Sequence, residues 1–150
     1  MVELALISRQ VAGGQLKLTL ANRREACEAA RLEVLAFVGP HTLSERAVFN
    51  LELVLEETLM NVIWHAFGDS PVEHPIELEV EVTPTAVVMR FADDGVAFDP
   101  TAVRELARPK SIADAVPGGL GLMLVRKLAS SVTYHRLDGC NRLTIVLGRG

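Results

Sequence analysis

The sequence has few aromatic residues, only two cysteines and no long apolar run. Aromatic residues make up 5% of the 150 residues and charged residues 23%, whereas 49% are hydrophobic, which is typical of a globular chain and excludes a disordered one. Cys27 and Cys140 lack the spacing of metal ligands, so we expect free thiols rather than a disulfide framework or a zinc site. Because no apolar run reaches about 18 residues and no basic segment leads into an apolar one, we expect a soluble, cytoplasmic protein that does not contact a membrane.

Positive charge is also scarce. Lys and Arg number 15 against 19 Asp and Glu, which gives a formal net charge of -4. Because the chain has no run of Lys and Arg, we do not expect it to bind nucleic acid directly. The length of 150 residues suits one domain, over residues 1–150, with a sizeable core, and is too short for two ordinary domains.

The spacing of apolar residues and of turn residues predicts five strands and three helices. They are strand 15–20, helix 23–38, helix 42–67, strands 76–82 and 86–92, helix 122–130, and a hairpin of strands 132–137 and 142–147 that reverses at 138–141. The residues before 15 are expected to form a short apolar lead-in. We expect Asn22 to cap the first helix, and Thr42 and Glu45 to cap the second helix reciprocally.

The segment 101–117 has only a weak pattern, with a short helical piece around 103–107, and is expected to be a loop or lid. The order of the other elements has two helices after the first strand, then two strands, and a last helix before the final hairpin. This order predicts an α+β fold, a two-layer sandwich in which a mostly antiparallel sheet carries helices on one face.

A polar stripe interrupts the long and otherwise apolar helix 42–67. At roughly 100° per residue, Asn50, Glu57, Asn61 and His65 fall within about a third of a turn of one another. Burying a carboxylate and an amide there would cost several kcal/mol unless something satisfies them, and a metal-nucleotide complex could do so. The alternative is that the stripe faces water, as one side of most globular helices does. Glu56 lies about 100° from the stripe and is expected to be a solvated neighbour, and His65 is expected to be a packed residue at the end of the helix.

A glycine-rich turn, Gly118-Gly119-Leu120-Gly121, leads into the helix predicted at 122–130. Glycines allow backbone N–H groups to approach phosphate oxygens, and a helix N-terminus carries partial positive charge. The turn lacks the Lys-Ser/Thr of a P-loop, and the strand and acidic residue of a dinucleotide fingerprint are missing. The turn is therefore either an anion site or a flexible cap of the helix.

A third motif, Asp93-Asp94-Gly95, follows the strand 86–92. A carboxylate there can accept a hydrogen bond from an exocyclic amine, which would favour adenine over guanine. The alternative is a plain acidic turn. Asp99 and Pro100 are expected to fix the loop where it leaves the motif.

The three motifs occur in an order and at spacings that resemble the GHKL ATP-binding superfamily, the histidine-kinase-like ATPases. The motifs are Glu57-x-x-x-Asn61, Asp93-x-Gly95 and Gly119-x-Gly121. The longer sequence segments that contain these motifs resemble most those of the bacterial anti-sigma factors with serine/threonine protein kinase activity. The resemblance extends from about residue 15 to 148. It implies the Bergerat/GHKL ATP-binding fold, with ATP and Mg²⁺ as ligands.

The resemblance also implies a role for each matching residue of the helix and of the acidic loop. Asn61 matches the asparagine that coordinates the Mg²⁺ bridging the ATP phosphates, and Glu57 matches the carboxylate that acts as general base. Asp93 matches the aspartate that binds the adenine amino group, and Gly95 the glycine beneath the base. The last glycine of the usual acidic motif is replaced here by Ala97, which leaves Gly95 as the loop's only glycine.

In the same way, Gly119 and Gly121 match the second glycine motif, whose backbone lines the phosphates, and Gly118 and Leu120 complete that turn. The segment 101–117 matches the ATP lid. Some relatives carry a basic residue where this chain has Trp64. Candidate phosphate contacts from the lid are therefore Arg104, Arg108 and Lys110.

The function implied by the resemblance is that of a switch kinase. Such a protein sequesters a sigma factor, phosphorylates a serine or threonine of a small anti-anti-sigma (STAS-type) protein, and forms a homodimer. A nucleotide-gated regulatory binding module without kinase activity is the main alternative. The catalytic domain of a two-component histidine kinase is disfavoured, because His41, the only histidine ahead of the long helix, lies in a Gly-Pro-His-Thr loop rather than in a dimerising hairpin. An α+β domain that binds no nucleotide is a further alternative.

Overall fold

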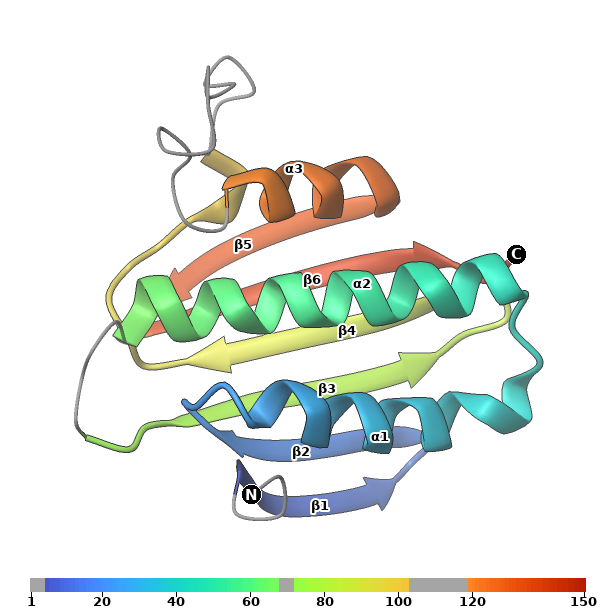
Figure 1. Cartoon of the computed structure of the whole chain (residues 1–150), viewed down its shortest axis with the longest axis horizontal. Coiled ribbons are helices and arrows are strands. Elements are labelled where there is room, and N and C mark those ends of the chain that lie inside the picture. The colour runs from blue at the N-terminus through green and yellow to red at the C-terminus, as the bar shows by residue number, and fades with distance from the viewer. Residues whose placement is uncertain (1–4, 68–71, 103–118) are drawn as a thin grey trace.

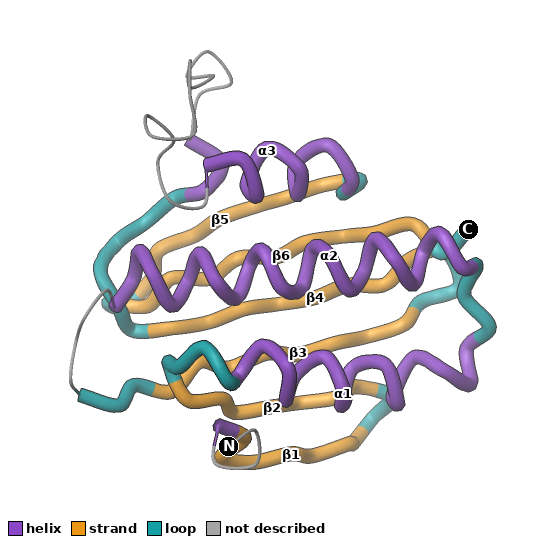
Figure 2. Tube along the Cα trace, viewed as in Figure 1, coloured by secondary structure: helices purple, strands orange, loops and turns teal. Residues whose placement is uncertain are grey.

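The computed structural model describes residues 5–67, 72–102 and 119–150, in which six strands form one antiparallel sheet and three α-helices cover one of its faces (Figures 1 and 2). The strands are β1 (Leu6–Ala12), β2 (Gln15–Ala21), β3 (Pro75–Val82), β4 (Ala86–Asp93), β5 (Ser131–Leu137) and β6 (Cys140–Gly148), and the helices are α1 (Ala26–Val38), α2 (Glu45–Asn61) and α3 (Gly119–Leu128). The strand order is β1-β2-β3-β4-β6-β5. The predicted α+β sandwich is confirmed.

The core lies between the sheet and the helices. Alternate residues of each inner strand are buried against them, as in β3, where Ile76, Leu78 and Val80 are fully buried. The other face of the sheet carries exposed ion pairs, of which Lys17 with Glu79 at 3.5 Å is one. Such pairs contribute about 1 kcal/mol or less, so burial of the apolar face stabilises the sandwich. None of the helices in the described part of the chain is both long and apolar enough to span a bilayer.

The expected lead-in before residue 15 is wrong, because β1 occupies it. β1 is an edge strand whose residues after Leu6 are all exposed, so it lacks the alternation that marks a half-buried strand. Gly13 and Gly14 join it to β2 with φ angles of 60° and 76°. Two successive positive φ angles are typical of a type I′ hairpin, for which Gly-Gly is a common sequence.

The predicted cap of the first helix is also wrong. α1 begins at Ala26, and the Asn22 side chain forms no cap. Its Oδ1 accepts a hydrogen bond from the backbone N–H of His74 at 2.9 Å, and its Nδ2 donates to the carbonyl of Val72 at 3.3 Å. Asn22 therefore ties the end of β2 to the segment that enters β3.

The second predicted cap is replaced by a neighbour. Ser44 is the N-cap of α2, and its Oγ accepts a hydrogen bond from the backbone N–H of Ala47 at 3.0 Å. Thr42 lies outside the helix in a left-handed conformation with a φ of 52°. The helix expected over 42–67 is α-helical only over α2, and residues 62–67 continue it as a π-helical turn.

The last predicted elements are shifted by a few residues. α3 begins three residues earlier than expected, so the glycines 119 and 121 lie in its first turn. The β5–β6 hairpin reverses at Asp138 and Gly139 alone, with φ angles of 53° and 76°, so Asn141 lies within β6 rather than in the turn. The predicted helical piece at 103–107, nearly all of the predicted lid, and Gly118 lie outside the described residues.

Candidate nucleotide-binding site

The end of α2, the end of β4, the start of α3 and the β5–β6 turn meet at one end of the sheet, on the left in Figure 1. A pocket that is partly open to solvent lies there. Asn61 and Asp93 line it together with mostly apolar side chains, among them Phe91 and Leu122. The structure therefore brings Asn61 of the helix stripe and Asp93 of the acidic motif to one pocket, whose mostly apolar lining with a few polar groups is typical of small-molecule sites.

Asn61 is the last residue of α2 and is buried, with 4% of its surface exposed. Its Nδ2 donates to the carbonyl of Glu57 at 2.7 Å, whereas its Oδ1 has no hydrogen-bond partner among the described residues. A buried polar atom without a partner costs about 1–3 kcal/mol. Because Asn61 is buried, it does not face water. Its unpaired amide oxygen is the kind of ligand that Mg²⁺ accepts.

Glu57 is half-buried one helical turn before Asn61, and its carboxylate lies against Gly121 of α3. A Cβ atom at residue 121 would lie 1.9 Å from Glu57 Oε2, so glycine leaves the space that the carboxylate occupies. Burial raises the pKa of the Glu57 carboxyl, and the charge of Glu56 raises it further. Glu56 itself is exposed, as predicted.

The glycine motif forms the first turn of α3. Gly119 and Leu120 are its first two residues, followed by Gly121. The first four N–H groups of an α-helix have no acceptor within the helix and carry partial positive charge. The motif therefore lies beside Glu57 with backbone donors that suit an anion.

Asp93 ends β4 and is buried, with 6% of its surface exposed. Its Oδ1 accepts two hydrogen bonds, one from the backbone N–H of Gly95 and one from Asn141 Nδ2, each 2.9 Å long. Burial raises the pKa of the Asp93 carboxyl, and these two hydrogen bonds oppose the increase. Because both bonds are made to Oδ1, Oδ2 is left as the acceptor for a ligand.

Gly95 lies where the loop after β4 crosses the π-helical turn that follows α2. A Cβ atom at residue 95 would lie 2.5 Å from the carbonyl oxygen of Ala66 and 2.6 Å from its Cβ. The next residue, Val96, donates its backbone N–H to the same Ala66 carbonyl at 2.9 Å. Only glycine permits this close approach, which holds the loop beside Asp93.

The chain is similar in sequence to known ATPase and kinase domains. The sequence profile of the histidine kinase-like ATPase domain matches residues 20–147. The chain belongs to the histidine kinase-like ATPase family. The serine/threonine-protein kinase BtrW of Bordetella bronchiseptica is 39% identical over 104 residues, which are 68% of this chain and 71% of BtrW. The solved histidine kinase domain of the Erythrobacter litoralis EL346 blue-light activated histidine kinase is 14% identical with a TM-score of 0.49, over 97% of this chain and 71% of that chain.

Membership of the histidine kinase-like ATPase family implies that the chain binds ATP. The donor set fits such a ligand, because the orphaned Oδ1 of Asn61 suits a metal ion between phosphates and the second oxygen of Asp93 suits an amine. The first turn of α3, which contains Gly119 and Gly121, supplies backbone donors next to Glu57. Arg104, Arg108 and Lys110, the candidate contacts from the lid, lie outside the described residues.

Two polar residues that line the ATPase pocket, Asn141 and Tyr134, and a third that contacts Asn141, Arg136, were not predicted from the sequence. Asn141, Tyr134 and Arg136 come from the β5–β6 hairpin, where the strand register pairs Asn141 with Asp93 on one side and with Arg136 on the other. The Asp138-Gly139 pair could have indicated their positions from the sequence, because a two-residue turn there fixes the register in which β5 and β6 pair.

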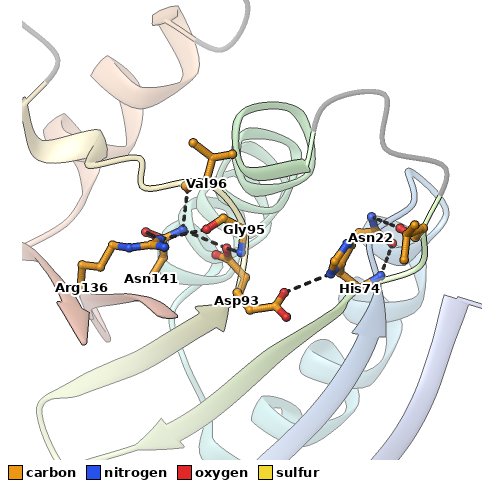
Figure 3. Close-up of polar contacts among 9 residues, drawn as sticks. Asn22, His74, Asp93, Gly95, Val96, Arg136 and Asn141 are labelled. Carbon is orange, nitrogen blue, oxygen red and sulfur yellow. Dashed lines mark hydrogen bonds and ion pairs between the residues drawn. The ribbon is translucent and has the colours of Figure 1, made fainter. Parts of the chain in front are cut away.

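Two expectations about the surroundings of the pocket are confirmed. His65 is a packed residue beyond the end of α2, and its ring stacks on Phe98 with centroids 4.2 Å apart. Asp99 Oδ1 accepts a hydrogen bond from the backbone N–H of Thr101 at 2.8 Å, which fixes the loop at that point. Asp94 is not among the residues that line the pocket and instead forms an ion pair at 3.3 Å with His74, which is labelled in Figure 3.

Proposed function

We propose that this ATPase domain is a protein serine/threonine kinase of the anti-sigma type. In this proposal it uses ATP and Mg²⁺ to phosphorylate a serine or threonine of a small anti-anti-sigma (STAS) protein, and as a homodimer it sequesters a sigma factor. The similarity to a protein named a serine/threonine kinase supports the chemistry. The observation that carries the proposal is the Glu57 carboxylate, held against Gly121 one helical turn before the orphaned Asn61 Oδ1.

Each residue of the proposed kinase site has a defined task. Asn61 Oδ1 would hold Mg²⁺, which when bound neutralises the negative charge of the phosphates. Glu57 accepts the proton of the partner's hydroxyl group while that oxygen bonds to the γ-phosphorus and the bond to the β–γ bridging oxygen breaks, so that ADP leaves. The raised pKa of Glu57 brings it nearer to the operating pH, where a general base is most effective.

Asp93 and the glycine turn bind and orient the nucleotide in the same proposal. The Asp93 carboxylate accepts a hydrogen bond from the exocyclic amine of adenine, and the first amides of α3 donate to phosphate oxygens. Positioning and charge neutralisation supply most of the rate in phosphoryl transfer, so these contacts matter as much as the base.

The proposal is tested by transfer of labelled γ-phosphate to a purified STAS protein. Glu57→Gln keeps the shape of the side chain and removes the base, and Glu56→Gln is the matched control because it alters the exposed neighbour. We expect a loss of about 100-fold or more for Glu57→Gln, in the range of general base catalysis, and little change for Glu56→Gln. ATP binding without transfer to any STAS protein would instead favour the nucleotide-gated binding module.

A further inference from the structure

Asn141 is the centre of the polar contacts beside the acidic motif (Figure 3). It is buried, with 5% of its surface exposed. Its Nδ2 donates to Asp93 Oδ1 and to the carbonyl of Val96, each at 2.9 Å. Its Oδ1 accepts from three donors, which are the Tyr134 hydroxyl, Arg136 Nη1 at 3.0 Å and the backbone N–H of Phe98 at 3.4 Å.

These contacts leave Asn141 no donor for a ligand. A primary amide has two N–H donors, and both are used, one by a side chain and one by the backbone of the loop. Asn141 lines the pocket that holds Asp93, yet its polar atoms are all turned toward the protein. It can therefore act on a bound base only through the residues that it holds.

Asp93 is the residue through which it acts. With Gly95 N–H and Asn141 Nδ2 both on Oδ1, the carboxylate is fixed about its terminal torsion, and Oδ2 is the oxygen left to accept a hydrogen bond. We propose that Asn141 is a positioning residue for base recognition, which directs Asp93 Oδ2 toward the exocyclic amine of adenine and so determines the preference for a 6-amino purine. This proposal rests on the proposed nucleotide site but not on kinase activity.

Arg136 connects Asn141 to the loop that follows Asp93. Its Nη1 donates both to Asn141 Oδ1 and to the carbonyl of Gly95 at 2.9 Å. The β5–β6 hairpin thus fixes the loop at Gly95, Val96 and Phe98 as well as the carboxylate. A rotation of Asp93 would break its hydrogen bonds with both Gly95 and Asn141, which is how the loop and the hairpin keep the acceptor in one orientation.

The test compares two nucleotides that differ only in the 6-amino group of the purine base. The dissociation constants of ATP and of purine riboside 5′-triphosphate, which lacks the 6-amino group, are measured by calorimetry on the full chain. A hydrogen bond to a charged group predicts that wild type prefers ATP by about tenfold or more. Asn141→Leu removes both donations at similar volume, and we expect this preference to fall toward one.

Asn22→Leu is the matched control. Asn22 also holds two backbone groups, those of Val72 and His74, but on the other side of the acidic motif (Figure 3). We expect it to lower stability and to leave the ATP preference unchanged. If Asn141→Leu weakens both nucleotides equally and keeps the preference, Asn141 is only structural and the proposal is overturned. A wild-type preference for ATP near one would overturn the proposal too, because Asp93 would then form no hydrogen bond with the 6-amino group.

Asn141→Asp keeps the shape and tests the same point if the leucine variant does not fold. Two adjacent carboxylates share a proton at low pH, and a protonated Asp side chain at 141 can donate to Asp93 as the amide does. We expect the ATP preference to be low near pH 8.5 and to recover as the pH falls, with Asp94, Arg136 and the Tyr134 hydroxyl as the other titratable groups near the pair. An ATP preference that equals that of wild type and does not change with pH would contradict the proposal. Absence of phosphate transfer would refute the kinase proposal without affecting this result.

Discussion

Gly121→Ala is expected to separate phosphate transfer from folding. The new Cβ would lie 1.9 Å from Glu57 Oε2 and 2.8 Å from Glu57 Cδ. Non-bonded carbon and oxygen atoms need about 3 Å or more, so the carboxylate must move by about 1 Å or more. It is the end of a flexible side chain, so it can move without displacing the backbone of α2.

The two expected magnitudes differ widely. Alanine is favoured over glycine within a helix by about 1 kcal/mol, which offsets the cost of moving the carboxylate, so the free energy of unfolding should change by about 1 kcal/mol or less. A misplacement of about 1 Å in a catalytic group can cost about 100-fold in rate, which is about 2.7 kcal/mol in the activation barrier. We therefore expect a folded protein with severely reduced transfer.

The assay measures the single-turnover rate of transfer from labelled ATP, with thermal unfolding recorded in parallel. Gly148→Ala is the control, since a Cβ atom there meets nothing within 4 Å. A Gly121→Ala protein that transfers phosphate at the wild-type rate would refute the reasoning, because the position of Glu57 against residue 121 would then not matter. A protein that fails to fold would show that the carboxylate cannot move aside as we infer.

Three further predictions concern Asp93, Gly95 and Cys27. Asp93→Asn retains Oδ1 as the acceptor for its two hydrogen bonds and replaces Oδ2 by a donor, so calorimetry should show ATP affinity reduced about tenfold or more. The folded-state pKa of Asp93 is raised above its ordinary value of 3.8, so the contribution of this carboxyl group to stability is lost as the pH rises through the raised pKa. The variant should therefore be at least as stable as wild type at neutral pH. A loss of about 2 kcal/mol in the free energy of unfolding would contradict this. Gly95→Ala meets the backbone oxygen of Ala66 at 2.5 Å, so denaturant unfolding should show a loss of about 1–3 kcal/mol, and an unchanged midpoint would count against the contact. Burial raises the pKa of the Cys27 thiol to about 11, so mass spectrometry should find slow alkylation at pH 8, and modification as fast as that of an unfolded peptide would contradict the raised pKa.

Elements with strong apolar periodicity were predictable from the sequence. β3 and β4 alternate because one face of each is buried, and their predicted ranges agree closely with the structure. Most of α2 was predicted for the same reason. β1 was not, because an edge strand with both faces largely exposed has no alternation to detect.

The candidate site was predictable where its residues lie in compact motifs. Asn61 and Asp93 line one pocket, as the motifs suggested. Glu57 lies one helical turn before Asn61, and Gly95 lies in the loop that follows Asp93. Asn141 was missed because its partner Asp93 is 48 residues away, and only the register of the sheet brings the two together. The caps were mistaken because Asn and Thr serve several local roles, and the choice depends on tertiary contacts such as that of Asn22 with the segment before β3.

The measurement that tests the account most directly is a structure of the protein with Mg²⁺ and a non-hydrolysable ATP analogue. The account predicts a metal–oxygen distance of about 2.0–2.1 Å from Asn61 Oδ1, which is the buried oxygen without a partner, and a hydrogen bond from the adenine amine to Asp93 Oδ2. A nucleotide bound elsewhere, or bound with Asn61 Oδ1 still uncoordinated, would contradict it.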